Sequence, residues 1–390
     1  MNERGIVLSD FQVVRPPNEA SQSDLNQWTL RRHLATREVF GAEDSLSPEQ
    51  YEKIFGRYAV RESMIAKRSF ECDDIQFADF ARARIYPVHD HQKSGSDIGT
   101  RTRFFVERAS RVFDQIYDQP RADKPSHMVH VTCTGYRSPS AAQLAVAKRE
   151  WGDEVAVTHA YHMGCYAALP AVRIAEGFIA AKQSFRTSSA GKPKAFNVDI
   201  VHTEMCGLHM NPAANTPEQI VVQSLFADGH IKYNARLSET NSPGFRVQAI
   251  KEKVVTGSDQ DMSWAPEAWG LQMNLSREVP EKIKGAINIF FARLAEEAGT
   301  SAERLLSRGI FAIHPGGPKI IQAVQEAMSL SDEQTQYSKR ILLERGNMSS
   351  ATLPHVWNSI LEANVPSGTP VVSFAFGPGL TIFGSVFETL

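Results

Sequence analysis

Three polar side chains of the types used in nucleophilic catalysis each lie beside a predicted turn: Cys165, His314 and Asn347. A cysteine and a histidine together can supply a nucleophile and its base or ion-pair partner. An asparagine adds a donor that can hold an oxyanion without titrating. Each residue singly also fits a structural role, as a buried thiol or as a turn residue. Sequence spacing alone does not show that the three side chains meet.

The segment around Cys165 predicts a turn from a strand to a helix. The apolar run 155–157 indicates a buried strand, and residues 171–181 have the pattern of a helix. Gly164 allows the tight backbone that such a turn needs. A thiol at the start of a helix faces unpaired N–H groups and the positive end of the helix dipole, and both favour the thiolate. These residues alone fit a nucleophile and a structural cysteine equally well.

The other two polar residues also follow recognisable elements. Residues 310–313 predict a strand that stops at His314, and Asn347 lies in a polar turn before a predicted helix over 353–363. Near the C-terminus, residues 377–379 (Gly-Pro-Gly) separate two predicted strands, which a simple hairpin would also explain.

Elsewhere the chain alternates predicted strands and helices, as an α/β layered fold does. Predicted helices cover residues 21–38, 48–58, 100–117, 141–148, 217–226, 280–299, 319–328 and 329–340, and predicted strands cover 6–8, 126–135, 195–201, 230–236, 370–376 and 380–387. The loop between two of these elements is placed at residues 190–193. Because the rhythm of the first half recurs in the second, we expect two duplicated halves, residues 1–237 and 238–390.

Composition narrows the class of protein. A chain of 390 residues is long enough for two domains or a duplicated one. The net charge of -2 argues against a protein that holds nucleic acid on a basic surface. The cysteines are widely spaced, with no CxxC and no zinc-like Cys/His cluster, so we expect no metal site and a reducing compartment. No leader segment and no apolar run of membrane-spanning length is apparent, and the cytoplasm is the expected location.

Six short motifs occur in the same order as in the type III polyketide synthases, the chalcone synthase-like branch of the thiolase superfamily. The chain resembles this family over nearly its whole length. The motifs are residues 63–68 (Ser-Met-Ile-Ala-Lys-Arg), 164–168 (Gly-Cys-Tyr-Ala-Ala), 226–229 (Phe-Ala-Asp-Gly), 314–318 (His-Pro-Gly-Gly-Pro), 346–351 (Gly-Asn-Met-Ser-Ser-Ala) and 377–381 (Gly-Pro-Gly-Leu-Thr). Any one motif is weak, whereas all six in order are highly specific. Related ketoacyl-ACP synthase III enzymes carry His-Gln-Ala-Asn and Gly-Asn-Thr-Ser instead, which favours the polyketide branch.

The resemblance implies a thiolase-like αβαβα layered α/β fold and a decarboxylative Claisen condensation. Malonyl-CoA would be condensed onto an acyl group held on Cys165, giving a pyrone, a resorcinol or a related polyketide. His314 would keep Cys165 ionised, and His314 and Asn347 would hold the malonyl thioester carbonyl. The resemblance also implies a homodimer that uses coenzyme A thioesters as substrates and needs no metal or other cofactor.

The resemblance extends to residues around the reacting thiol. Phe226 matches a gatekeeper between the entry tunnel and the cavity, although it also fits an ordinary core position. Gly377 lies in a loop that is expected near the oxyanion. Lys67 and Arg68 lie in the segment near the coenzyme A entrance and are candidates to contact its phosphates; a solvated basic segment is the alternative.

Several positions depart from the family pattern. Met273 stands in place of a second gatekeeper Phe, Ser138 in place of a methionine that crosses between subunits, and His209 where a small Thr is common. Cys133 and Cys206 are also expected near the cavity. We therefore expect a reshaped cavity rather than one for chalcone formation.

Two other functions stay open from the sequence. One is a ketosynthase III-like enzyme or acyltransferase that performs a single condensation with chains bound to a carrier protein. The other is a non-catalytic binding member of the fold, against which the intact Cys-His-Asn set argues.

Overall fold

A nine-stranded mixed sheet forms the centre of the protein. In this computed structural model, residues 5–41, 46–88, 92–119, 123–186, 196–237 and 243–390 are described. The strand order is β11-β12-β13-β8-β1-β7-β6-β4-β5, and two small two-stranded sheets, β2–β3 and the hairpin β9–β10, lie apart from this sheet. The strands are β1 (Ile6–Val14), β2 (Asn18–Ser21), β3 (Lys67–Phe70), β4 (His127–Thr132), β5 (Ala156–Tyr161), β6 (Asn197–Met205), β7 (Asp228–Leu237), β8 (Phe245–Val254), β9 (Met262–Pro266), β10 (Leu271–Leu275), β11 (Ile310–Ile313), β12 (Pro370–Gly377) and β13 (Thr381–Thr389).

The helices lie in three layers around the sheet. They are α1 (Gln22–Phe40), α2 (Pro48–Tyr58), α3 (Ile98–Tyr117), α4 (Ala141–Lys148), α5 (Ala168–Arg186), α6 (Pro217–Leu225), α7 (Val279–Glu297), α8 (Ala302–Arg308), α9 (Pro318–Met328), α10 (Asp332–Arg345) and α11 (Thr352–Glu362), with short 3-10 turns at Asp73–Gln76, Phe80–Arg82, Cys206–His209 and Ser349–Ala351. None of these helices is long and apolar enough to cross a membrane.

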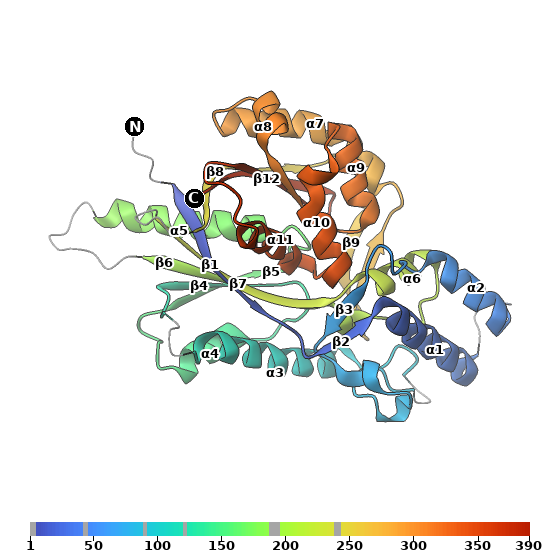
Figure 1. Ribbon diagram of the computed structural model, residues 1–390. Helices are drawn as coiled ribbons and strands as arrows, with labels where there is room; N and C mark the ends of the chain where they lie inside the picture. Colours follow the sequence, from blue (N-terminus) through green and yellow to red (C-terminus); the bar gives the residue numbers. More distant parts are fainter. Residues whose placement is uncertain (1–4, 42–45, 89–91, 120–122, 187–195, 238–242) are drawn as a thin grey trace.

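Helices α5 and α11 form the middle layer. Figure 1 shows them between the part of the sheet with β4, β6 and β7 and the part with β8 and β12. Their apolar side chains share one buried cluster with residues from both parts of the sheet. Helices α3 and α4 cover one outer face, and α7 and α9 cover the other. The expected αβαβα layering is therefore confirmed.

Strand directions repeat along the chain. β4 runs parallel to β6, β6 antiparallel to β7, and β7 antiparallel to β1. In the same way β11 runs parallel to β12, β12 antiparallel to β13, and β13 antiparallel to β8. The division into halves 1–237 and 238–390 stays a prediction. Residues 238–242, where it falls, and the predicted loop 190–193 lie outside the described residues.

Local sequence signals set most helix starts. Ser47 and Gln50 form a capping box at α2, and Ser140 and Gln143 form another at α4. Helix α1 begins at Gln22, one residue after its predicted start, because Ser21 is the N-cap and accepts from the main-chain N–H of Asp24.

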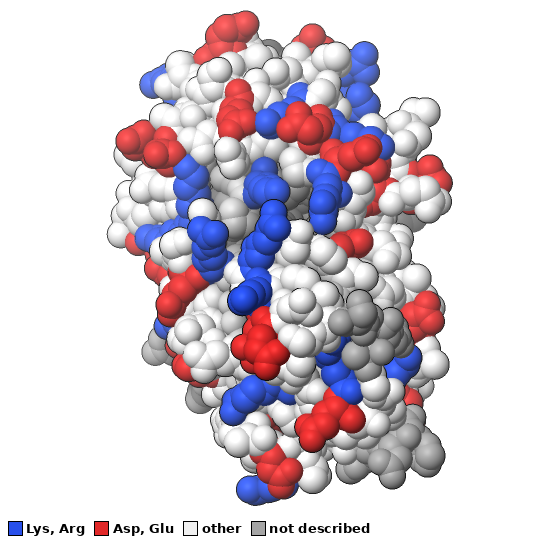
Figure 2. Space-filling model, turned by 90° about the vertical axis from the view of Figure 1, so that its right-hand side faces the viewer, with Lys and Arg blue, Asp and Glu red and all other residues white. Residues whose placement is uncertain are grey.

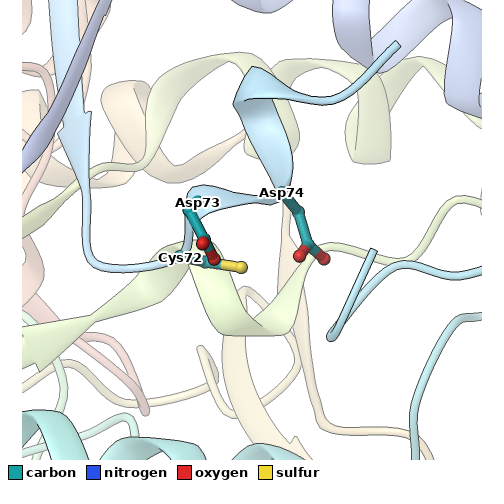
Figure 3. Close-up of side chains that lie close together, drawn as sticks. All are labelled: Cys72, Asp73 and Asp74. Carbon is teal, nitrogen blue, oxygen red and sulfur yellow. The ribbon is translucent and has the colours of Figure 1, made fainter. Parts of the chain in front are cut away.

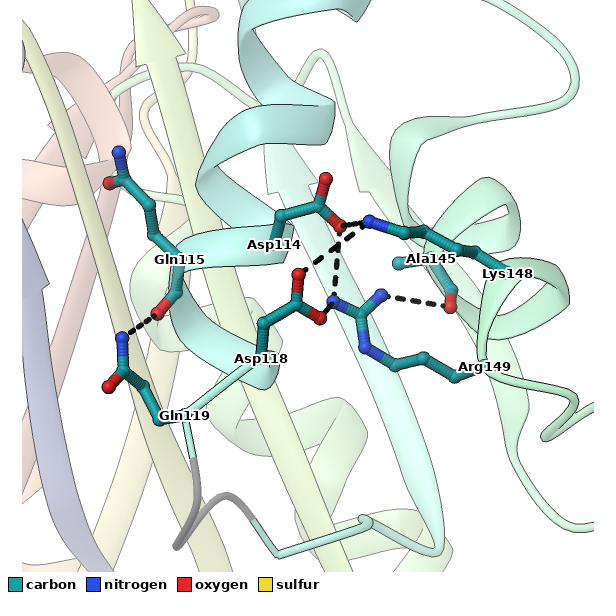
Figure 4. Close-up of polar contacts among 7 residues, drawn as sticks. All are labelled: Asp114, Gln115, Asp118, Gln119, Ala145, Lys148 and Arg149. Carbon is teal, nitrogen blue, oxygen red and sulfur yellow. Dashed lines mark hydrogen bonds and ion pairs between the residues drawn. The ribbon is translucent and has the colours of Figure 1, made fainter.

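A charged network joins α3 to α4. Lys148 and Arg149 both contact the carboxylates of Asp114 and Asp118 (Figure 4). Three of these four side chains are at least one-third exposed, so their ion pairs contribute little to the free energy of unfolding. The network mainly fixes how the two helices are oriented.

The strand before Cys165 differs from the prediction. It runs from Ala156 to Tyr161, and only Ala160 within it is buried. The reason is its place at the edge of the sheet, where it pairs with β4 alone. The prediction of a buried strand at 155–157 was therefore wrong, although the strand itself exists.

Candidate active site

Cys165 lies in the turn between β5 and α5, three residues before the helix begins. Gly164 has a φ of +83°, and a Cβ at this position would collide with the ring of Pro378. Only glycine therefore fits between the turn and the loop that follows β12. The buried Cys165 Sγ lies 3.8 Å from Ser349 Oγ, within the range of a hydrogen bond to sulfur.

Asn347 connects the other two candidate residues. Its Oδ1 accepts from the main-chain N–H of Ser349 at 2.9 Å. Ser349 is the residue whose hydroxyl contacts Cys165. The Nδ2 of Asn347 donates to the carbonyl of Gly316 at 3.4 Å, in the turn that follows His314. Its main chain pairs with that of Phe226 in an isolated bridge. The Asn347 turn is thus held between the cysteine, the histidine turn and the predicted gatekeeper.

His314 follows β11, and its main-chain N–H donates to the carbonyl of Phe374 at 2.7 Å. The imidazole is buried, and neither ring nitrogen has a partner among the described residues. An unpaired buried polar group is costly and rare in a folded protein. The two ring nitrogens of His314 are therefore available to bind a substrate.

Burial controls the protonation of this site. Desolvation raises the pKa of Cys165 to about 12, although contacts with Ser349 and Asn347 lower it. Desolvation also lowers the pKa of His314 to about 3. Both shifts favour the neutral thiol and neutral imidazole over an ion pair. The sequence predicted that the start of the following helix favours the thiolate of Cys165. In the structure, burial outweighs this effect and favours the neutral thiol.

A cavity of about 360 Å³ lies in front of Cys165. It is lined by four of the predicted residues: Phe226, Met273, Cys133 and Cys206. A second cavity, of about 690 Å³, shares Phe226, Met273 and Cys206 as a wall. Most of the residues that separate the two cavities were therefore among those predicted from the sequence.

His209 lines the second cavity and not the one in front of Cys165. Its Nε2 lies 2.8 Å from the carbonyl of Thr134, and its Nδ1 accepts from the N–H of Leu271 at 3.1 Å. Burial lowers the pKa of His209 to about 3. This histidine is therefore a neutral, fully engaged wall residue rather than an acid or base.

Two residues that sequence reasoning missed complete the site. Trp264 lines both cavities, and its Nε1 donates to the carbonyl of Cys133 at 2.7 Å. It lies directly opposite Met273 in the β9–β10 hairpin. The second residue is Ser349, beside Cys165. Recognising the hairpin in 262–275 would have paired Trp264 with Met273 from the sequence alone.

Buried Glu204 ties two of these segments together. Its carboxylate accepts from the main-chain N–H of Cys133 at 3.0 Å and from the hydroxyls of Thr134 and Ser350. Burial raises its pKa. Glu204 thus anchors the end of β4 to the turn that carries Asn347 and Ser349.

Gly377 and Ser138 have different surroundings. A Cβ at Gly377 would collide with the ring of Tyr166, next to the nucleophile, so this loop packs closely on the cysteine turn. Ser138 precedes a cis proline, is exposed and does not line either cavity.

Lys67 and Arg68 differ strongly. Arg68 is buried and donates to Gln22 Oε1 and to the carbonyls of Gln223 and Phe226. Its guanidinium binds main-chain carbonyls at and near Phe226, the predicted gatekeeper. This argues against a contact with coenzyme A phosphates. Lys67 is exposed and pairs with Glu19 at 2.8 Å, so its predicted role stays open.

One further group of potential metal ligands is structural. Cys72, Asp73 and Asp74 lie close together (Figure 3). The Asp74 carboxylate, however, accepts from three successive main-chain N–H groups, those of Arg84, Ile85 and Tyr86, at 2.7–2.8 Å. We therefore assign Asp74 to holding this loop.

Comparisons with known proteins agree with this fold and with the resemblance that the motifs indicated. Residues 246–390 match the chalcone and stilbene synthase C-terminal domain family. The chain is 25% identical over 272 residues to type III polyketide synthase C of Arabidopsis thaliana, which covers 68% of each protein. It is 28% identical over 274 residues to a probable polyketide synthase of Dictyostelium discoideum, covering 68% of this chain and 8% of that longer protein.

The fold is that of solved members of the same group. Polyketide synthase PKS-I of the brown alga Ectocarpus siliculosus superposes with a TM-score of 0.80 and 20% identity over all of both chains. With the family match and the relatives, this places the chain among enzymes that form carbon–carbon bonds by condensation. The chain is thus similar in sequence to type III polyketide synthases and has the fold of solved members of that group.

Proposed function

We propose that Cys165 carries the growing acyl chain and that His314 and Asn347 hold malonyl-CoA while it loses carbon dioxide. The product is a pyrone, a resorcinol or a related polyketide. The observation that carries the proposal is the pair of unpartnered nitrogens on buried His314, joined through Gly316 and Asn347 to Ser349 beside the thiol.

The first step loads the enzyme. The Sγ proton of Cys165 passes to a ring nitrogen of His314, and the thiolate attacks the acyl thioester carbonyl. The carbon–sulfur bond to coenzyme A breaks, and the departing thiolate takes the proton from His314 and leaves as free coenzyme A. An acyl thioester on Cys165 and a neutral imidazole remain.

The second step forms the new carbon–carbon bond. His314 and Asn347 donate to the thioester carbonyl of malonyl-CoA, where negative charge develops as the carboxylate leaves as carbon dioxide. Donors fixed in a buried site stabilise such an enolate more strongly than water does. The enolate carbon attacks the acyl thioester, and Cys165 is released as the thiolate. These steps balance without a metal or redox cofactor.

We infer that the acyl donor rides on coenzyme A rather than on a carrier protein. Type III polyketide synthases use coenzyme A thioesters, and the relatives named above do not favour the single-condensation alternative. Figure 2 shows Lys and Arg side chains gathered in a band on the face that carries α2, α6 and α9. A basic surface of this kind attracts the anionic phosphates of coenzyme A.

We also infer a homodimer. β5 is an edge strand with one neighbour and a mostly exposed or half-buried surface. An unpaired strand edge is a ready template for a second copy. The cytoplasmic location stays a prediction from the cysteine pattern.

The test is intact-protein mass spectrometry after exposure to a panel of acyl-CoA thioesters, followed by labelled malonyl-CoA. We expect one acyl adduct on Cys165, release of labelled carbon dioxide and products longer by two-carbon units. Cys165→Ala should lose the adduct. Cys206→Ala is the matched control, because its thiol lines the same cavity and should leave the adduct in place. An adduct that persists in Cys165→Ala, or no carbon dioxide release, contradicts the proposal.

A further inference from the structure

A polar cleft that is separate from both cavities lies between the end of β1, the last turns of α10, and α11. Its volume is about 1090 Å³. Arg15 and Arg345 line it from opposite elements, with Arg340, Asn358 and Ser359 alongside. We call it the α10–α11 cleft.

Arg345 is a half-buried cation without a counter-ion. Its side chain makes no hydrogen bond and no ion pair within 4.0 Å among the described residues, and its Nε is buried and unpartnered. Burial lowers the pKa of Arg345, and the positive charge of Arg15 lowers it further. Arg15 is likewise without an ion pair in the described chain. The cleft therefore brings two cations together without a direct ion pair in the described residues, while Glu344, Glu19 and Glu362 act on Arg345 from beyond 4.0 Å.

Three fully buried arginines of this protein are held by acceptors of the chain itself. Arg32 donates to the carbonyls of Tyr86 and Pro87, and Arg101 donates to those of Ser96 and Met210. Arg68 is satisfied in the same way. Arg345 differs from these three, whereas the Nε atoms of Arg108, Arg149 and Arg246 are buried and unpartnered like its own.

The neighbouring carboxylates do not fill the gap. Glu19 already pairs with Lys67 at 2.8 Å, and Glu362 accepts from Asn358 at 2.8 Å. Glu344 lines the cleft but forms no ion pair with Arg15 or Arg345 within 4.0 Å in the described residues. No carboxylate of the described chain therefore pairs directly with Arg15 or Arg345.

We propose that the α10–α11 cleft binds a phosphate group between Arg15 and Arg345. Three arginines line the cleft, Arg15, Arg340 and Arg345, against two carboxylates, so the lining keeps a net positive charge for an anion. A phosphate offers at least three acceptor oxygens, enough for two planar guanidinium forks, whereas a carboxylate offers only two. Arg340 spends one nitrogen on Ser359 and keeps other donors for the same ligand.

The cleft adjoins the catalytic asparagine in sequence. Arg345 is followed by Gly346, whose φ is +71°, and then by Asn347. A phosphate held by Arg345 would therefore sit at the start of the turn that places Asn347. The binding itself does not depend on the proposed condensation, so either proposal can fail alone.

The test is isothermal titration of the full-length protein with inorganic phosphate, at constant ionic strength in chloride. We expect saturable binding of one phosphate per chain, and at least tenfold weaker binding for Arg15→Gln and for Arg345→Gln. Arg15 is exposed, so its variant tests the site even where Arg345→Gln fails to fold. Arg111→Gln, at an exposed position of α3, is the control and should bind as the wild type does.

Three outcomes overturn the proposal. The first is the absence of saturable binding. The second is phosphate binding that survives Arg15→Gln unchanged, which would place the anion elsewhere, for example on the coenzyme A face. The third is acetate binding as tightly as phosphate, which would make the ligand a carboxylate. Glycerol phosphate forms a further arm: tighter binding than inorganic phosphate assigns the site to a phosphomonoester, and weaker binding assigns it to the free ion.

Discussion

The hydroxyl of Ser349 lies 3.8 Å from the thiol of Cys165, although 184 residues separate the two in the chain. Ser349 belongs to the turn that Asn347 organises, so the contact joins the nucleophile to the asparagine turn. The same contact lowers the pKa of Cys165 against the stronger effect of burial. The chemistry of the thiol therefore depends on a segment from the far end of the sequence.

His314→Gln is expected to slow alkylation of Cys165 by iodoacetamide at pH 7 by at least tenfold. Without a base to take its proton, the thiol must ionise unaided, and burial raises its pKa to about 12. The rate in the variant should then rise about tenfold per pH unit between pH 7 and 10. Mass spectrometry of the alkylated peptide measures both profiles. Ser349→Ala keeps the base and should show a smaller loss; identical profiles for wild type and His314→Gln would contradict the role of His314.

Thermal stability is expected to fall as the pH decreases from 7.5 to 5.5. Six buried histidines have pKa values lowered to about 3 or 4: His33, His130, His202, His209, His314 and His355. Below about pH 6.5 the unfolded chain binds protons that these folded groups do not, so the free energy of unfolding decreases. Burial raises the pKa of Asp228 to about 8, so this group binds a proton in the folded state and not in the unfolded chain. It therefore offsets roughly one of the protons that the unfolded histidines bind. We expect Tm to drop by about 10 °C, and calorimetry at fixed ionic strength checks it; a flat Tm would contradict the buried neutral state.

Trp264→Ala is expected to open the wall between the two cavities. Trp264 lines both, opposite Met273, so its removal should let longer acyl chains extend into the larger space. We expect the ratio of turnover with long to short acyl-CoA thioesters to rise about tenfold, measured by product chromatography. Trp264→Phe keeps most of the bulk and serves as the control. If Trp264→Ala leaves the chain-length preference unchanged, Trp264 does not limit the length of the acyl chain.

Arg68→Met is expected to lower the free energy of unfolding by about 2–4 kcal/mol, because buried carbonyls of Gln223 and Phe226 lose their donor. Lys67→Met is the adjacent control. Its exposed ion pair with Glu19 is worth about 0–1 kcal/mol. Urea unfolding measures both. An increase in KM for malonyl-CoA in Lys67→Met alone would support its contact with coenzyme A phosphates, whereas equal stability losses would contradict the structural assignment of Arg68.

The sequence by itself determined most of the elements and indicated the candidate reacting residues. Periodic apolar patterns and capping residues such as Ser47 and Ser140 act within one or two turns, so they can be read locally. The ordered motifs around Cys165, His314 and Asn347 indicated a resemblance to the type III polyketide synthases, and the comparisons find the same similarity.

Only the tertiary structure decided how these groups work. It put the strand before Cys165 at a sheet edge, buried Arg68, moved His209 behind the cavity wall and set Trp264 opposite Met273. Burial, strand pairing and the absence of a counter-ion for Arg345 all depend on contacts between segments far apart in the chain. Such contacts arise from packing, and no local pattern of residue types encodes them.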